Sequence, residues 1–395
     1  MKKVYKSHFL LLLTALAVVA CTKDDTDFSD YDFSNYSLRS TTGDDDNDVV
    51  NTIYIVYNGS SASVTGDDRG YVSVAGADVT VNTGTDTDSL LLVLSGSTTD
   101  GSLLVYREKK YGIMLNGVTI HNADGPAINN QCKKSLFLDV ASGTVNTLTD
   151  GTAYTELLDV DGNVIDQKGT LFSEGQLYFM GHGTLRVEGS CKHAIACDDY
   201  VVFSDDVTLT ATSATGNGIK VNDGIYIDKG TIDIQVTADG ARGIKSDAVV
   251  VITGGTVAID TQGDCVYDSD AADYSSAACI KCDADFTMSG GSLTMTSSGD
   301  GGKGLNCSTS VFVSGGTFSA VTTGTKEDAK PKAVKGTTGI FLSGGSFYAK
   351  AGNSTWACDN GTDSSVYSER VTIDTSANGS PITTAFAKSE VTVSW

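Results

Sequence analysis

The sequence predicts an all-β protein whose body is a single-stranded parallel β-helix, with about 24–25 residues in each coil and capping β segments at its ends. Three observations predict this fold: a motif that repeats along the chain, short strands of alternating apolar residues, and the absence of helical periodicity. The composition agrees, because 44 Gly against 3 Pro favours many short strands joined by tight turns.

Each repeat opens with an apolar residue that is often followed by lysine. The openings are spaced by 24, 24, 25, 36, 25, 29 and 24 residues, and insertions explain the two longest steps. They are Leu171, Ile195, Ile219, Ile244, Ile280, Leu305, Val334 and Cys358. Repeats of this length predict one strand-rich coil each, stacked on the next.

Two columns of apolar residues identify the core of the predicted solenoid. Six positions after the openings stand Leu177, Val201, Ile225, Val250, Phe286, Val311 and Ile340. Eight positions after them stand Phe179, Phe203, Ile227, Ile252, Met288, Val313 and Leu342. Because successive side chains of a strand alternate between its faces, both columns are expected to point inward and to stack at ~4.8 Å per coil.

The first 50 residues are predicted to be a targeting segment and a tether. Residues 1–20 combine lysines with a short apolar run, as in a signal peptide. The run Val18–Cys21 resembles a bacterial lipobox, which implies acylation of Cys21 and a lipid anchor; a secretory signal with a chance cysteine is the alternative. Because Thr22–Asp25 resembles an export tag, we expect an outer-membrane lipoprotein at the cell surface, held by an acidic tether over residues 21–50.

The remaining chain divides by pattern into three parts. Residues 51–120 are strand-like and are expected to lead into the solenoid and cover its first coil. The parallel β-helix is expected over residues 121–365, and residues 366–395, which alternate less regularly, are expected to cap its other end.

The charge of the chain restricts its partners. A formal net charge of −22 with no basic patch argues against nucleic acid. An acidic protein can still bind a polyanion, through a bridging cation or a local row of lysines.

Motifs between residues 113 and 151 resemble those of a known family. The runs Ile113–Ile120, Gly125–Ile128 and Gly143–Gly151 follow the motif order of a bacterial carbohydrate-binding β-helix family, first described for a clostridial protein that binds cellulose and acidic sugars. The similarity covers roughly residues 51–350. It implies a right-handed β-helix similar to polysaccharide lyases, bound calcium, and adhesion to plant polysaccharide.

A row of lysines one position after the openings is predicted to point outward. It contains Lys220, Lys245, Lys281 and Lys335, and an acidic row that includes Glu174, Asp198, Asp247 and Asp283 follows two positions later. Neighbouring rows of opposite charge predict a surface ion ladder, since each relieves the repulsion within the other. The alternative is a linear strip that binds the carboxylates of an acidic polysaccharide.

A catalytic version of this strip would make Lys245 the base of a calcium-dependent polysaccharide lyase. Its neighbours Lys220 and Lys281 carry like charges, which lower the pKa of a lysine. Such a base could remove a proton that a nearby cation has made more acidic.

Aspartates in the turns before the repeats, together with Asp247 of the acidic row, are candidate calcium ligands. The candidates are Asp239, Asp247, Asp264 and Asp300. Calcium prefers carboxylate oxygens, and an extracellular protein meets it at millimolar concentration. Solvation of exposed loops is the alternative interpretation.

An aromatic-rich column seven positions after the openings is also predicted to point outward. Its aromatic members are Tyr178, Tyr226, Phe312 and Phe341. An exposed apolar stripe favours an interface, and aromatic rings can stack on sugar rings, so a glycan platform is one hypothesis. A terminal segment or loop that covers the column is the other.

The positions of two cysteines suggest one disulfide bridge. Cys265 and Cys279 flank an insertion, and a disulfide that joins its ends is the hypothesis, since an exported protein permits one. Cys197, Cys282 and Cys307 fall at inward positions and are expected to be small core residues.

These patterns favour a monomeric cell-surface protein that binds acidic or cellulosic polysaccharide without catalysis, with calcium as a possible requirement. The alternatives are a pectate-type lyase with a lysine base and a structural adhesin that binds another protein.

Overall fold

The structure is a computed structural model that describes residues 50–86, 88–159, 161–352, 355–364 and 367–395. The predicted signal peptide, the predicted acylation site Cys21 and nearly all of the predicted tether lie outside the described residues. Residues 48–395 form one compact unit, to which the following description applies. Within the described residues, no helix is long and apolar enough to cross a membrane.

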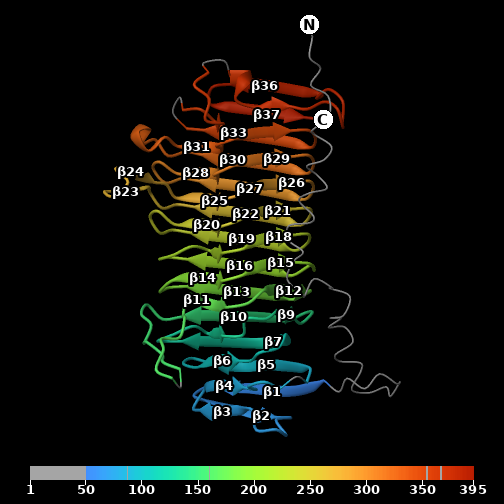
Figure 1. Ribbon diagram of the computed structural model, residues 1–395, viewed down its shortest axis with the longest axis vertical. Coiled ribbons are helices and arrows are strands. Elements are labelled where there is room, and N and C mark those ends of the chain that lie inside the picture. The colour runs from blue at the N-terminus through green and yellow to red at the C-terminus, as the bar shows by residue number, and fades with distance from the viewer. Residues whose placement is uncertain (1–49, 87, 160, 353–354, 365–366) are drawn as a thin grey trace. The chain divides into compact units, whose positions relative to one another are not determined.

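The chain folds into a parallel β-solenoid, as the sequence predicts (Figure 1). Its strands stack coil upon coil along one axis and form three faces. The 12-stranded first face consists of β3 (Val72–Ala75), β4 (Asp78–Asn82), β6 (Ser102–Tyr106), β8 (Ile128–Asn130), β11 (Gly169–Ser173), β14 (His193–Cys197), β17 (Ile219–Val221), β20 (Arg242–Ser246), β25 (Ala278–Cys282), β28 (Lys303–Cys307), β31 (Lys332–Gly336) and β34 (Cys358–Asp359).

The other two faces belong to one 23-stranded sheet, because long N-terminal strands run across both. These long strands are β1 (Asn51–Asn58), β5 (Leu90–Thr98) and β7 (Tyr111–Asn122). The second face continues through β9 (Leu136–Val140), β12 (Leu177–Gly181), β15 (Tyr200–Phe203), β18 (Gly224–Ile227), β21 (Val250–Ile252), β26 (Phe286–Met288), β29 (Ser310–Val313), β32 (Gly339–Leu342) and β35 (Thr372–Ile373). The third continues through β10 (Val145–Asp150), β13 (Thr184–Gly189), β16 (Thr208–Ser213), β19 (Thr231–Val236), β22 (Thr256–Thr261), β27 (Ser292–Ser297), β30 (Thr317–Thr322) and β33 (Ser346–Ala351).

Antiparallel strands occupy both ends of the described solenoid. At the N-terminal end β2 (Ser61–Thr65) pairs with β1, and β3 pairs with β4. At the C-terminal end β37 (Glu390–Ser394) pairs with β33 and with β36 (Thr383–Ala387). Parallel stacking already begins where β1 pairs with β5, so the first coils form within residues 51–120.

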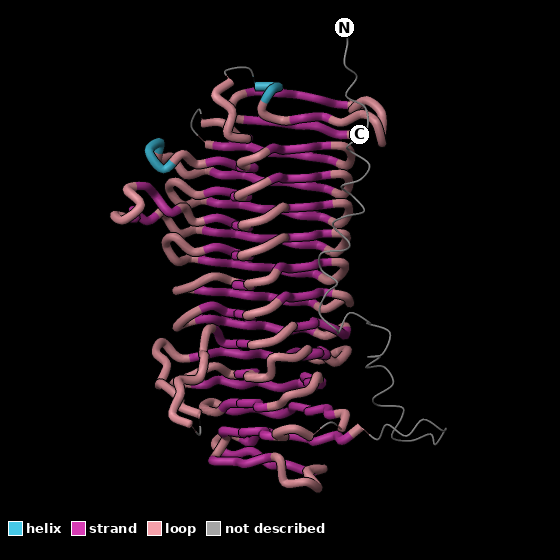
Figure 2. The backbone as a smooth tube through the Cα atoms, in the orientation of Figure 1, coloured by secondary structure: helices cyan, strands magenta, loops and turns pink. Residues whose placement is uncertain are grey.

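Loops leave the stack at the two long steps of the repeat. The first carries the small hairpin of β23 (Val266–Asp268) and β24 (Asp273–Ser275), and the second carries the short helix η3 (Glu327–Ala329). A second short helix, η4 (Tyr367–Glu369), lies near the C-terminus. Figure 2 shows the hairpin and the short helix projecting from the same edge of the stack.

The predicted core columns are confirmed. Every member of both columns is buried, and neighbours in a column are register partners, as Phe203, Ile227 and Ile252 are. The openings of the repeats are likewise buried and in register along the first face. One continuous apolar core therefore runs through the coils.

Glycines with positive φ stack at the turns between the second and third faces. Gly255, Gly291, Gly316 and Gly345 have φ of 71°, 74°, 78° and 80°. A Cβ atom on Gly291 would lie 2.5 Å from the carbonyl oxygen of Gly254 in the preceding coil. The turn thus needs glycine both for its backbone angle and for close stacking of coils.

Candidate functional site

The predicted lysine row lies on the outward side of the first face. Lys220, Lys245 and Lys281 are register partners on β17, β20 and β25. Each follows a buried apolar residue, so strand alternation turns it away from the core. Lys335 on β31 belongs to the same column beyond Asn306, and it forms no ion pair with the described residues.

Two aspartates alternate with these lysines along the face. Together the five residues form a charge ladder, which consists of Lys220, Asp247, Lys245, Asp283 and Lys281. Asp247 binds Lys220 and lies 2.6 Å from the Nζ of Lys245. Asp283 lies 2.5 Å from the Nζ of Lys245 and 2.7 Å from that of Lys281. Burial alone would raise the pKa of Asp283, but hydrogen bonds from the two lysines lower it to about 2. The predicted ion ladder thus forms, and its lysines have acid partners.

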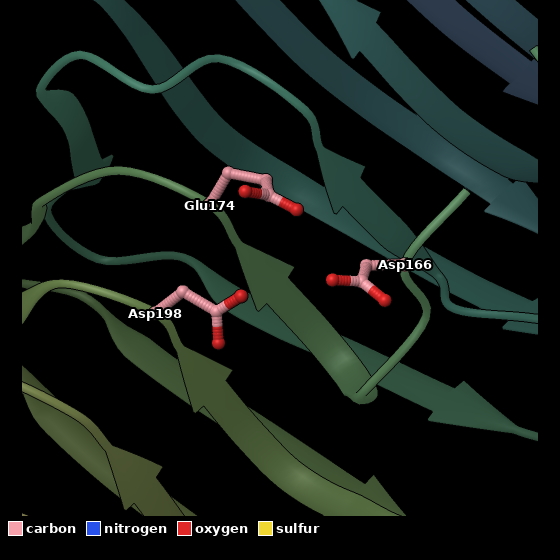
Figure 3. A group of neighbouring side chains, drawn as sticks. All are labelled: Asp166, Glu174 and Asp198. Carbon is pink, nitrogen blue, oxygen red and sulfur yellow. The ribbon is translucent and has the colours of Figure 1, made fainter. Parts of the chain in front are cut away.

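An acidic cluster, defined as Asp166, Glu174 and Asp198, lies on the same face toward the N-terminus (Figure 3). Asp166 precedes β11, Glu174 follows β11, and Asp198 follows β14. One oxygen from each carboxylate lies within 4.8 Å of the others. Burial, and then repulsion from Asp198 and Asp166, raise the pKa of Glu174. The sequence places Glu174 and Asp198 in the acidic row but gives no signal for Asp166, which a loop brings to them.

One ammonium group already partly compensates the acidic cluster. The Nζ of Lys168 lies 2.9 Å from Asp166 and also binds Asp198. Three carboxylates with one ammonium leave two negative charges, which a divalent cation would neutralise. Carboxylate oxygens are also the ligands that calcium prefers, so the donor set fits that ion.

The acidic cluster and the charge ladder form one continuous row of polar contacts. Asn222 links them, because its Oδ1 accepts a hydrogen bond from Lys220 at 2.8 Å and its Nδ2 donates one to Asp198 at 3.3 Å. The row extends over β11, β14, β17, β20 and β25. The first face therefore carries charged groups at intervals of about one coil, ~4.8 Å.

Three of the predicted calcium ligands have a different role in the structure. Oδ1 of Asp239 accepts a hydrogen bond from the backbone of Asp264 at 2.8 Å, and Asp264 and Asp300 repeat this contact toward the next coil at 2.7 and 2.8 Å. Asp247 lies in the charge ladder. Among the described residues, the three carboxylates that converge closely enough for a metal are those of the acidic cluster.

The aromatic column lies on the second face and stacks on itself, and it is not the exposed stripe that the sequence predicts, because Tyr178 is buried and Tyr226, Phe312 and Phe341 are only partly exposed. The rings of Phe312 and Phe341 are 5.1 Å apart at 14°, and that of Tyr178 lies 4.8 Å from Phe137 at 12°. Tyr226 meets Tyr200 edge to face. Because stacked rings turn their faces toward each other, Phe312 and Phe341 present mainly ring edges outward.

The suggested bridge between Cys265 and Cys279 does not form, since both residues are free thiols. Cys279 points into the core, where its Sγ donates to the carbonyl oxygen of Thr296 at 3.1 Å. The ends of the insertion are held by backbone hydrogen bonds instead, including one of 2.8 Å from Cys265 to Asp300. Cys197, Cys282 and Cys307 are buried, as expected.

Comparisons with known proteins identify a family and a similar solved structure. Residues 75–242 and 234–329 match the model of a family described as carbohydrate-binding domain-containing protein. A solved polysaccharide lyase-like protein from C. thermocellum, in its gadolinium derivative, is 24% identical, with a TM-score of 0.49, over 66% of this chain and 96% of that one. No curated protein matches the chain.

Proposed function

Because the chain belongs to the carbohydrate-binding domain-containing family, we propose that it binds an acidic polysaccharide at the cell surface without cleaving it. The polymer lies along the first face of the solenoid, over the acidic cluster and the charge ladder. Calcium in the acidic cluster joins the protein to a carboxylate of the polymer.

The observation that carries this proposal is the continuous row of charged groups along one face. A linear polymer with a carboxylate on each sugar repeats its charge along one direction, as the row does at intervals of ~4.8 Å. Lys220, Lys245 and Lys281 supply several donors each, and their side chains are 23%, 15% and 22% exposed. Among the described residues, the ammonium of Lys281 contacts only Asp283 and Ser308, so one of its three donors is available to a ligand.

Calcium is needed because the row is not positive overall. The aspartates of the charge ladder compete with any incoming carboxylate for the lysines, and the acidic cluster repels it. A calcium ion bound by Asp166, Glu174 and Asp198 would remove this repulsion and could itself bind a carboxylate of the polymer. Calcium takes six to eight oxygen ligands, so positions remain for water and for a carboxylate of the polysaccharide.

The surroundings of Lys245 favour binding over catalysis. A lysine base must be neutral before it removes a proton. The Nζ of Lys245 lies between Asp247 and Asp283, and loss of its proton would leave both carboxylates with one fewer cation. A lyase built on this residue would have to break two ion pairs before each turnover.

An acidic polymer is favoured over a neutral glucan by the geometry of the aromatic column. A flat glucan would need ring faces to stack on, whereas Phe312 and Phe341 stack on each other. The predicted lipid anchor at Cys21 supports a location at the outer membrane, where the solenoid would meet extracellular polymer and calcium.

A sedimentation assay with insoluble acidic polysaccharide tests this proposal. The full chain should bind cross-linked polygalacturonate in millimolar calcium and lose binding in excess chelator. Glu174→Gln should weaken the calcium-dependent binding at least tenfold, because it removes one ligand charge from the acidic cluster. Asp68→Asn, the same kind of change at an exposed position of the N-terminal end, should leave binding unchanged. Equal binding by the parent in calcium and in chelator would refute the role of calcium.

A further inference from the structure

Two cationic side chains lie beneath the hairpin of β23 and β24, outside the proposed glycan site. Arg242, Ala278 and Lys303 are successive register partners on β20, β25 and β28. The short side chain of Ala278 stands between the two long ones. The hairpin is an insertion within the 36-residue step of the repeat, and it lies over this part of the column.

The heads of both side chains reach consecutive serines at the base of the hairpin. Nη2 of Arg242 donates a hydrogen bond to Oγ of Ser275 at 2.8 Å. Nζ of Lys303 donates one to Oγ of Ser276. Because adjacent residues have Cα atoms ~3.8 Å apart, both positive groups are held at the base of the same hairpin.

Neither cation has an acid partner. Within the part of the chain that the structure describes, no carboxylate forms an ion pair with Arg242 or Lys303. Lys303 is 8% exposed, and the Nε of Arg242 is buried with no hydrogen-bond partner. Burial, with repulsion from Lys335 and Lys332, lowers the pKa of Lys303 to about 8, and burial lowers the pKa of Arg242. Burial outweighs the attraction of Asp283 for Arg242 and of Asp273 for Lys303, and a buried charge without an ion-paired partner is unfavourable, so an anion between the two side chains would be stabilising.

We propose that a small inorganic anion of halide size binds between Arg242 and Lys303, beneath the hairpin. The guanidinium Nε–H of Arg242 and the ammonium of Lys303 donate to it, and the hydroxyls of Ser275 and Ser276 can turn to do the same. The site is closed to a polymer, because Ser276 is 4% exposed and Ala277 and Ala278 are fully buried. The bound anion neutralises the two cations and holds the hairpin on the solenoid.

Thermal unfolding of the full chain at constant ionic strength tests this site. Chloride is the probe, and gluconate, which is too large to enter, replaces it in the reference buffer. The melting temperature of the parent should rise with chloride and then saturate, because a ligand at ten times its Kd shifts the folded-to-unfolded ratio about elevenfold. A melting temperature that is the same in both salts would overturn the proposal.

Substitutions show whether the effect comes from this site. Lys303→Met and Arg242→Met should each abolish the dependence on chloride, whereas Lys229→Met, at an exposed lysine, should keep it. Dependence on chloride that survives in Lys303→Met would overturn the assignment. If both variants fail to fold, bromide-soaked crystals of the parent decide: an anomalous peak in contact with Arg242 and Lys303 is expected, and its absence would overturn the site.

Discussion

Replacing Lys245 by Met tests whether the charge ladder stabilises the solenoid. The substitution keeps the length of the side chain and removes an ammonium that binds Asp247 and Asp283 at 2.6 and 2.5 Å. Exposed ion pairs contribute about 0.2–1 kcal/mol each, and hydrogen bonds to charged groups about 1.5–3 kcal/mol. Both aspartates are about 40% exposed and keep a second lysine. The range for exposed ion pairs therefore applies, and the loss of two pairs should lower the free energy of unfolding by about 0.4–2 kcal/mol.

The dependence of this loss on pH identifies its source. The folded protein holds the pKa of Asp283 at about 2, below its ordinary 3.8. A carboxyl with a lowered folded pKa contributes stability that is complete above the unfolded pKa and disappears as the pH falls through the folded one. The gap between parent and variant should thus be full at neutral pH and should shrink between about pH 4 and about pH 2.

Denaturant titrations across this pH range supply the measurement, with Lys229→Met as the control for loss of a lysine charge. A gap that stays constant down to about pH 2 would refute the assignment of the stability to these carboxylates. A variant within about 0.3 kcal/mol of the parent at neutral pH would show that the charge ladder is energetically neutral.

Three further expectations follow from the fold and the acidic cluster. Ile227→Asp buries a carboxylate between Phe203 and Ile252 and should cost several kcal/mol, whereas the outward Thr231→Asp should cost far less; equal melting temperatures would contradict the register. Gly291→Ala should destabilise more than Gly143→Ala, because both have φ of 74° but a Cβ on Gly143 meets no atom within 4 Å; equal losses of stability would show that coil stacking is not limiting. Millimolar calcium should raise the melting temperature above that in chelator, and Glu174→Gln should remove the rise; identical curves for the parent would exclude a structural calcium site.

The sequence was sufficient to predict the solenoid because its register repeats in every coil. A residue such as Ile227 occupies the same inward position as its counterparts in other coils, so its burial can be read from the column. The outward rows could be placed in the same way, and Lys245 lies beside Lys220 and Lys281 as expected.

Contacts made by loops, and contacts that depend on side-chain conformation, could not be predicted from the repeating columns of residues. The loop before β11 brings Asp166 to the acidic cluster, and no periodic signal marks that residue. The hairpin that covers Lys303 belongs to an insertion, whose fold the repeat does not describe. Asp239 and Asp264 accept hydrogen bonds from backbone N–H groups of the following coil, a contact that their position in the repeat does not reveal.

The central claim is that this protein binds an acidic polysaccharide and leaves it intact. In the most direct measurement, the full chain is incubated with soluble polygalacturonate in millimolar calcium. Both complex formation and the ultraviolet absorbance of unsaturated sugar products are followed. We expect saturable, calcium-dependent binding with no increase in absorbance. A sustained increase would show a lyase, and the absence of binding in calcium would contradict the proposed function.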